Sequence, residues 1–235
     1  MLKILNLNLW NYNNFEKRKP FIIDFIKKHK PDIIIFQEVR DDLEFNKEGE
    51  NQAKQINKSL KFPFELFCPV TDKRNERPEK YKLQCLEGTA ILSKFPIMNH
   101  EIIQLKKYDD CIYSRGNVCF KIKAEKEIDF IAVHFAPNEI HSKLDLKETL
   151  DYVEKKKISS IIVGDFNFID SNLLFDLTKE NFMSSYEFKN YISYPKANFT
   201  LDYILIPNEF SFRSFQCLGT NLSDHKVLIA EIELK

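Results

Sequence analysis

The feature that most constrains this chain is a series of short apolar runs with strand-like periodicity, which extends along nearly its whole length. KILNLNLW at 3–10 alternates leucines with amide side chains, which is the period of a half-buried strand. DIIIFQEV at 32–39 is nearly continuous and β-branched, which is typical of a buried strand. Further runs of this kind occupy 64–70, 88–95, 100–105, 117–124, 128–135, 159–166, 201–206, 210–218 and 226–234. Several are separated by turns alone, so we expect mainly antiparallel sheets.

Four segments interrupt the strand pattern with apolar residues at helical spacing. We expect helices at 20–29, 51–60, 142–157 and 172–180. Pro20 suits the first turn of the first helix, and Ser142 suits the N-cap of the third. Many strands with a few amphipathic helices predict two sheets packed face to face with helices on the outer faces. This is a four-layer αββα sandwich of the α/β (α+β) class.

The domain organisation is simple. The chain shows no internal repeat and no Gly/Ser-rich or Pro-rich linker, so we expect one domain over residues 1–235. The charged stretch at 71–82 is expected to be an exposed, weakly positive loop within that domain.

Composition excludes several classes of protein. Hydrophobic residues make up 43% and charged residues 30%, so the chain can bury a core and is not disordered. Lys+Arg and Asp+Glu both number 35, which counts against a protein that binds duplex nucleic acid through its overall field. The 5 Cys form no CxxC pair, so we expect buried thiols rather than disulfides or a Cys-based zinc site. Neither a signal peptide nor a membrane-spanning run is apparent, and we expect a cytoplasmic protein.

Polar residues gather at the ends of the expected strands. They are Asn8, Glu38, His134, Asp165, Asn167, Asp202, Asp224 and His225. In a sandwich, the C-terminal ends of some strands and the N-terminal ends of others share one rim, so these side chains can meet in one cleft. Each has a structural explanation when taken singly: GDFN at 164–167 suits an Asx-turn, and a lone His is usually a satisfied structural residue. His29, His100 and His141 keep that structural explanation.

Several motifs occur together in a characteristic order. They are LNLNLWN (5–11), KPDIIIFQEV (30–39), GTAILSKFPI (88–97), VHF (133–135), IIVGDFN (161–167), LDYIL (201–205) and SDH (223–225). In this order they resemble the endonuclease/exonuclease/phosphatase superfamily of metal-dependent phosphoesterases, which includes deoxyribonuclease I. The resemblance implies the four-layer sandwich, hydrolysis of a phosphoric ester, and a requirement for Mg²⁺, with Mn²⁺ as an alternative.

The resemblance also implies roles in binding the metal and the phosphate. Glu38 resembles the direct ligand of the divalent ion, and Asn8 resembles the residue that binds the phosphate or the water shell of the metal. Asn167 resembles a phosphate contact. Asp224 resembles a residue that approaches the metal or holds its loop.

Four residues resemble the groups that move or hold protons. Asp165 resembles the residue that orients or deprotonates the attacking water, while Asp202 and His225 resemble a paired dyad. His134 resembles the second histidine of deoxyribonuclease-like members. A His225 cation held by Asp202 could donate to a phosphoryl oxygen as charge builds on it. His225 as general base, with Asp165 as the positioning group, stays open.

Three further residues have two interpretations each. Arg115 in SRGNV could bind a phosphate of the substrate or simply serve the turn with Gly116. Glu87 could orient His134, although an exposed charge at a strand edge is the favoured explanation. Trp10 is expected in the core rather than stacked on a substrate.

The sequence therefore predicts an enzyme. The leading hypothesis is a Mg²⁺-dependent phosphodiester hydrolase, a nuclease or a phosphodiesterase of nucleic-acid ends. The alternative is a phosphoesterase of lipid or inositol phosphates, and the lack of an evident membrane-inserting segment counts against it. A non-catalytic binding protein of the same fold is less favoured, and a purely structural β-rich protein is least favoured. No obligate protein partner is indicated.

Overall fold

The structure is a computed structural model that describes residues 1–219 and 221–235. The first of its two sheets has the order β11-β12-β1-β2-β4-β3 and the second has the order β5-β6-β7-β8-β10-β9. The strands of the first sheet are β1 (Leu2–Asn8), β2 (Ile33–Asp42), β3 (Phe64–Asp72), β4 (Cys85–Ser93), β11 (Phe210–Leu218) and β12 (Val227–Leu234). Those of the second are β5 (Ile97–Gln104), β6 (Gly116–Lys123), β7 (Glu127–His134), β8 (Ser160–Asp165), β9 (Phe182–Ser184) and β10 (Asp202–Pro207).

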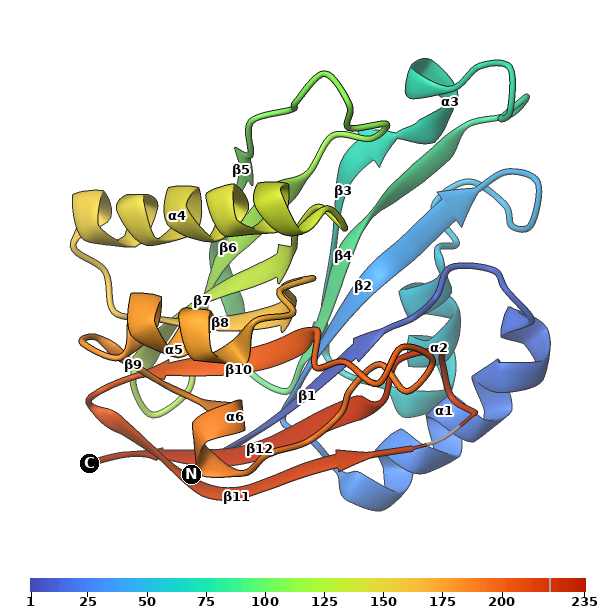
Figure 1. The fold of residues 1–235 in the computed structure, drawn as a ribbon. Helices are drawn as coiled ribbons and strands as arrows, with labels where there is room; N and C mark the ends of the chain where they lie inside the picture. The colour runs from blue at the N-terminus through green and yellow to red at the C-terminus, as the bar shows by residue number, and fades with distance from the viewer. Residues whose placement is uncertain (220) are drawn as a thin grey trace.

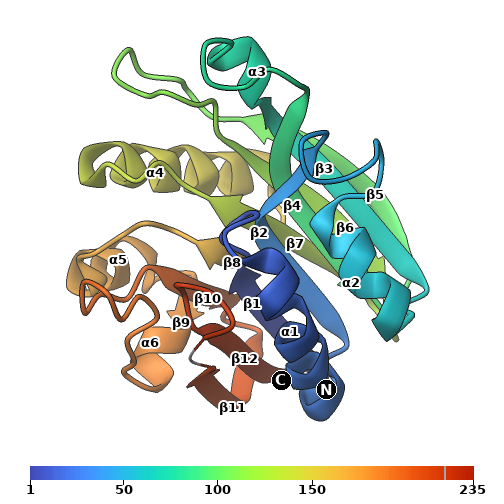
Figure 2. The same cartoon turned by 90° about the vertical axis from the view of Figure 1, so that its right-hand side faces the viewer.

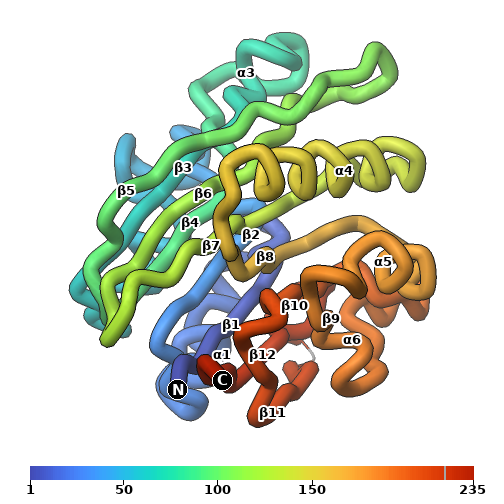
Figure 3. Tube along the Cα trace, turned by 90° about the vertical axis from the view of Figure 1, so that its left-hand side faces the viewer, coloured from blue at the N-terminus to red at the C-terminus, as the bar shows by residue number. Residues whose placement is uncertain are grey.

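Helices cover the outer faces of both sheets, so the predicted four-layer sandwich is confirmed. The first sheet is covered by α1 (Phe15–His29) and α2 (Gln52–Leu60), as Figure 2 shows. The second is covered by α4 (Glu139–Lys156) and α5 (Ser171–Thr178), as Figure 3 shows. Two short helices, α3 (Lys73–Glu76) and α6 (Ser185–Phe188), complete the set. No helix among the described residues is long and apolar enough to cross a membrane.

Each sheet contains one parallel pair of strands among antiparallel neighbours. β1 pairs with β2 in parallel, and β7 pairs with β8 in parallel (Figure 1). The crossover connections are α1 and α4. Carboxyl ends of parallel neighbours lie at the same edge of a sheet. β10 runs antiparallel to β8, so its first residue, Asp202, lies opposite Asp165, the last residue of β8.

The period of two along each strand decides which residues face the partner sheet. In β1, Ile4 packs in the core between the sheets, whereas Leu5 and Leu7 pack beneath the helices. In β8, Ile161 and Val163 face the inter-sheet core. The residues of one strand that face the partner sheet form its inner row, and at the strand ends these inner rows continue with polar side chains.

Several local expectations were wrong. Helix α1 begins at Phe15, so Pro20 lies inside it rather than in its first turn. Helix α4 begins at Glu139, where Asn138 and not Ser142 caps it by accepting backbone N–H groups. The stretch 71–82 is not simply an exposed loop, because β3 continues to Asp72 and α3 follows. Strand β9 was not expected, since it is only 3 residues long.

Candidate active site

Asp165, at the end of β8, is the centre of a group of polar side chains between the two sheets. Its Oδ2 atom accepts a hydrogen bond of 3.0 Å from Asn8 Nδ2. The same oxygen lies 3.8 Å from His134 Nε2 and 3.9 Å from His225 Nε2. Three chain segments distant in sequence therefore converge on one buried carboxylate oxygen, as the strand-end pattern predicted.

The inner rows of the strands explain this convergence. Asn8 continues the row of Ile4, His134 that of Phe130 and Ala132, and Asp165 that of Ile161 and Val163. His134 lies directly opposite Asp165 in the β7·β8 ladder. The inner faces of both sheets therefore end in polar groups at the same rim.

Gly164 permits the close approach of β7 and β8 beside Asp165. A Cβ atom built on Gly164 would lie 2.0 Å from the carbonyl oxygen of Val133, where no side chain fits. Glycine is therefore required at this position for the strand pairing that sets Asp165 beside His134.

Asp202 and His225 form the expected dyad. His225 Nδ1 lies 2.8 Å from Asp202 Oδ2, and both side chains are buried. Burial opposes a charge on His225, but attraction by Asp202 and Asp165 outweighs it and raises the pKa of His225 to about 10. His225 is therefore a cation at neutral pH, with its Nε2 directed toward Asp165.

The same surroundings act on Asp165 in the opposite direction. Burial raises the pKa of Asp165 to about 7, although His225 nearby counteracts the rise. A carboxyl group with such a pKa can exchange a proton near neutral pH, which a general base requires.

Glu38 reaches this group through an irregularity in β2. The pairing of β2 with β4 shifts register between Phe36 and Val39, and Glu38 has a φ of 54°. Gln37 continues the inner row of β2, so a regular strand would turn Glu38 toward the helices. The irregularity directs it to the rim instead, where its Oε1 accepts a hydrogen bond of 3.3 Å from Asn8 Nδ2. Burial, followed by repulsion from Glu87, raises the pKa of Glu38.

His134 lies close to Glu38, and Arg115 lies against His134. His134 Nε2 is 3.9 Å from Glu38 Oε1, and Arg115 Nη1 lies 2.9 Å from His134 Nδ1. Burial, and then the charges of Arg115 and Lys73, lower the pKa of His134 well below its ordinary value. Neutral His134 and cationic His225 therefore flank Asp165. Arg115 belongs to the group and does not merely serve a turn.

We call Asn8, Glu38, His134, Asp165, Asp202 and His225 the strand-end cluster. Asn167 lies beside it: its backbone N–H donates to Asp165 Oδ1 at 3.0 Å, which closes the expected Asx-turn. The Asn167 side chain donates to the carbonyl oxygen of Phe135. Asp224 lies at the edge, where Lys196 Nζ is 3.6 Å from its Oδ2. Asp224 is therefore near the strand-end cluster in sequence, through His225, but its carboxylate faces Lys196.

A second group of charges, which was not predicted from the sequence, adjoins Glu38. Glu87 is buried and accepts from Arg40 Nε at 2.6 Å and from Lys73 Nζ at 2.9 Å. The expectation of an exposed Glu87 was therefore wrong, because two cations neutralise it inside the protein. Arg40, Lys73 and Glu87 come from different elements, so no local spacing in the sequence indicated this group. Asn11 was also missed, and it donates to Glu38 Oε2 at 3.1 Å.

Trp10 is not a core residue, contrary to expectation. Its backbone has a φ of 53°, which is unusual for a bulky side chain, and its N–H donates to Asn8 Oδ1 at 2.9 Å. The ring is half-buried, and Lys196 Nζ lies 4.4 Å from its centre. An aromatic ring and a cation therefore stand beside the strand-end cluster.

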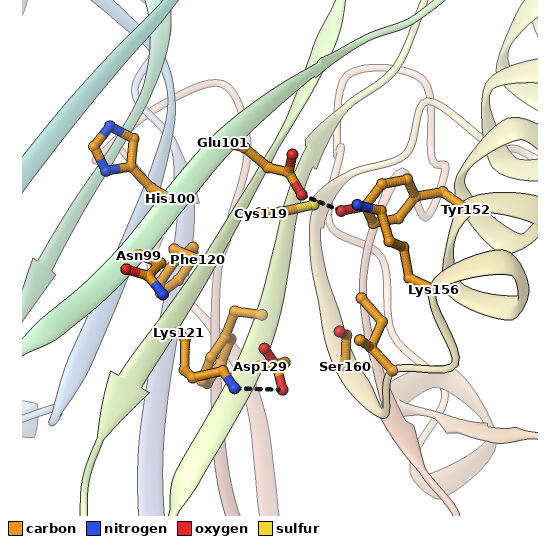
Figure 4. Close-up of a pocket in the computed structure, with 12 residues that line it drawn as sticks. Asn99, His100, Glu101, Cys119, Phe120, Lys121, Asp129, Tyr152, Lys156 and Ser160 are labelled. Atoms are coloured by element: carbon orange, nitrogen blue, oxygen red, sulfur yellow. Dashed lines mark hydrogen bonds and ion pairs between the residues drawn. The ribbon is translucent and has the colours of Figure 1, made fainter.

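Glu38 of the strand-end cluster lines a cavity of about 370 Å³. The charged lining is balanced, because Arg40, Lys73 and Arg115 face Glu38, Glu87 and Asp110. Glu87 already pairs with Arg40 and Lys73, so Arg115 is the lining cation that no carboxylate of the described residues neutralises by an ion pair. A second cavity of similar size lies outside β6 and β7 (Figure 4), where Lys121 lies 3.7 Å from Asp129. The first cavity is the candidate for substrate binding, because Glu38 and Arg115 line it.

The residues around Asp165 fit a hard divalent cation. Glu38 and Asp165 supply carboxylate oxygens, and these are the ligands that Mg²⁺ and Mn²⁺ prefer. Asp165, Asp202 and His225 have ligand atoms within 4.8 Å of one another, but a His225 cation cannot coordinate a metal, so the carboxylates are the candidate ligands. Buried Asp202 Oδ1 has no hydrogen-bond partner among the described residues, which leaves one carboxylate oxygen of this group without a donor.

Comparison with known proteins decides the family. The model of the endonuclease/exonuclease/phosphatase family matches residues 6–225. The chain belongs to this family. Its members are hydrolases of phosphoric esters and generally depend on a divalent metal. No curated protein sequence matches the chain at a significant level.

Solved structures of the family share the fold. A family protein from Leptotrichia buccalis C-1013-b is 19% identical, with a TM-score of 0.80 and 100% of both chains covered. The catalytic domain of human Nocturnin with a bound sulfate anion is 19% identical, with a TM-score of 0.72 over 100% of this chain and 94% of that one. A mannosyl-6-phosphatase from Bacteroides thetaiotaomicron is 17% identical, with a TM-score of 0.69 and 100% of both chains covered. At these identities the likeness concerns the fold.

Proposed function

We propose that this family member is a Mg²⁺-dependent phosphodiester hydrolase that acts on a nucleotide or a nucleic-acid end. The observation that carries the proposal is the placement of Asp165 Oδ2 between Asn8 and two histidines of different charge. One carboxylate able to accept a proton thus lies beside one imidazolium able to donate a hydrogen bond. Hydrolysis of an anionic phosphoric ester needs both functions in one place.

In this proposal Asp165 is the general base. It accepts the proton of a water molecule whose oxygen forms the new bond to phosphorus, and the P–O bond to the leaving group breaks. The raised pKa of His225, about 10, favours this assignment over His225 as base, because a cation cannot accept the proton. Asp202 keeps the His225 ring oriented, and His225 donates to the phosphoryl oxygen on which charge builds.

Other residues bind and position the substrate. A cation held by Glu38 would supply positive charge to a phosphoryl oxygen and would leave Asp165 free to accept the proton. Asn8 Nδ2 donates to both Glu38 and Asp165, which fixes the positions of the two carboxylates relative to each other. Arg115 is placed to contact a phosphoryl oxygen, since its guanidinium lies against His134 at the cavity.

Two features support a nucleotide. Trp10 offers an aromatic surface beside Asn8, and Arg115 lines the cavity next to Glu38, where Arg40 and Lys73 are paired with Glu87. Aromatic surfaces stack on bases, and cationic side chains bind phosphates. A phosphomonoester of a small sugar is the second candidate, because a mannosyl-6-phosphatase shares the fold along its entire length.

The test is a substrate panel with and without metal. Dinucleotides, single-stranded oligonucleotides with blocked ends, inositol phosphates and sugar phosphates are incubated with Mg²⁺, with Mn²⁺ and with EDTA. We expect turnover of a nucleotide phosphodiester that EDTA abolishes and that Asp165→Asn lowers about a thousandfold. Asp129→Asn, a carboxylate of the cavity in Figure 4, is the matched control and should keep full activity. Undiminished turnover by Asp165→Asn would contradict the mechanism, and hydrolysis of sugar phosphates alone would replace the substrate class.

A further inference from the structure

A second group of ligand-type side chains lies where the segment between β5 and β6 meets the start of α4. Cys111 Sγ is 3.2 Å from His141 Nδ1, and His141 Nε2 is 3.3 Å from Asp110 Oδ1. One ligand atom from each of the three residues lies within 4.8 Å of the other two. We call Asp110, Cys111 and His141 the loop cluster. It shares no residue with the strand-end cluster.

The types of ligand in the loop cluster point to a particular class of metal. A thiolate and an imidazole bind borderline and soft cations such as Zn²⁺, whereas Mg²⁺ prefers oxygen atoms alone. Three protein ligands leave one coordination position open, as in zinc sites that exchange a water molecule or a ligand. We propose that the loop cluster is a transition-metal site of the zinc class, separate from the Mg²⁺ site of hydrolysis.

The surroundings of His141 prepare it for this role. Its side chain is buried, its backbone N–H donates to Asn138 Oδ1, and its ring stacks on Tyr108 at 4.4 Å. These contacts fix the ring before any ligand arrives, which lowers the entropy lost on binding. The imidazole is therefore held in position for a ligand to bind.

The hydrogen bonds within the loop cluster connect its residues without a metal as well. Cys111 and His141 are 30 residues apart in sequence, so their contact fastens an irregular segment to a helix. A metal bound to both would replace this contact with coordinate bonds from Cys111 Sγ and one nitrogen of His141, and exposed Asp110, which now contacts the other nitrogen, would turn to supply the third ligand.

Because of the position of the loop cluster, a metal bound there would also affect the strand-end cluster. Asp110, Cys111 and His141 line the same cavity as Glu38 and Arg115. Arg115 ends the segment that contains Cys111, and it contacts His134 of the strand-end cluster. A metal at the loop cluster would hold this segment in place and, with it, Arg115 against His134.

The experiment uses Co²⁺ as a spectroscopic probe, because thiolate coordination to cobalt produces a charge-transfer band in the near ultraviolet. Full-length reduced protein, freed of metal and supplied with excess Mg²⁺, is titrated with Co²⁺. We expect a band that saturates at one equivalent and that Zn²⁺ bleaches by displacement. Cys111→Ser should abolish the band, and His141→Gln should weaken cobalt affinity about tenfold or more. Cys217→Ser, which alters the other half-buried thiol, should leave the band unchanged.

The outcomes separate this inference from the proposed function. Absence of the band from the wild-type protein, or its persistence in Cys111→Ser, would overturn the site. Circular dichroism verifies that each variant is folded. If Cys111→Ser does not fold, His141→Gln provides the test instead. Asp165→Asn, which lacks the proposed general base, should still show the band, because the strand-end cluster contains no thiol. Loss of hydrolysis and loss of cobalt binding are therefore independent results.

Discussion

The strand-end cluster and the loop cluster lie along one cavity, yet the protein positions them by opposite means. Asn8, His134 and Asp165 terminate inner rows of strands and are held by the hydrogen-bonded ladders of both sheets. Cys111 belongs to a segment without regular structure, and only His141, in the first turn of α4, is fixed by a regular element. A sheet can therefore hold the side chains of a site in place before a metal binds, whereas a site on a loop depends on its ligand to order the loop.

Of the variants that distinguish the two clusters, the one with the largest expected effect on turnover weakens metal binding at the strand-end cluster alone. Glu38→Gln should lower turnover about a hundredfold or more, because a neutral amide replaces a carboxylate ligand of the cation. Raising the Mg²⁺ concentration should restore part of the activity, and steady-state kinetics against Mg²⁺ would measure this. Glu125→Gln, at an exposed position, is the control. The thiolate–cobalt band of Cys111 should persist in Glu38→Gln, and its loss would break the distinction between the two clusters.

A smaller effect is expected where the two clusters meet. Arg115→Ala should lower turnover about tenfold, less than the hundredfold or more that loss of a direct oxyanion donor costs. Arg115→Lys should recover part of the loss because the charge remains. Since the charge of Arg115 helps to lower the pKa of His134, NMR titration of His134 should show a higher pKa in Arg115→Ala. An unchanged His134 titration would contradict the contact between them.

The smallest effect concerns stability. The pKa of Asp165 is raised to about 7, so the folded protein binds this proton more tightly than the unfolded chain does. Its contribution to stability therefore falls as the pH rises from about 4 through about 7. In EDTA at pH 8, Asp165→Asn should raise the free energy of unfolding by about 1 kcal/mol, because it removes an unfavourable buried charge. Urea denaturation measures the change. Asp129→Asn should not stabilise the protein, and a less stable Asp165→Asn would contradict the assignment.

The sequence was informative where a side chain continues a regular row. Asn8, Asp165 and Asp202 follow the alternation of their strands, so both the sandwich and most of the strand-end cluster could be predicted from period and order. Glu38 shows the limit, because it was singled out by its motif while its direction depends on an irregular backbone with a φ of 54°.

Contacts that depend on tertiary packing were not predictable. Glu87 pairs with Arg40 and Lys73 from two other elements, so alternation within β4 cannot reveal its partners. Cys111 and His141 meet through a loop whose path no local pattern predicts. Cys111 was predicted to be a buried thiol and His141 a structural histidine, because each was considered within its own segment.

The pairing of β1 with β12 has a consequence for folding. β12 pairs antiparallel to β1, and His225 lies two residues before β12 in sequence. Asn8, the last residue of β1, and His225 are distant in sequence and come together only when these two strands pair. Assembly of the strand-end cluster is therefore coupled to a long-range step in forming the first sheet.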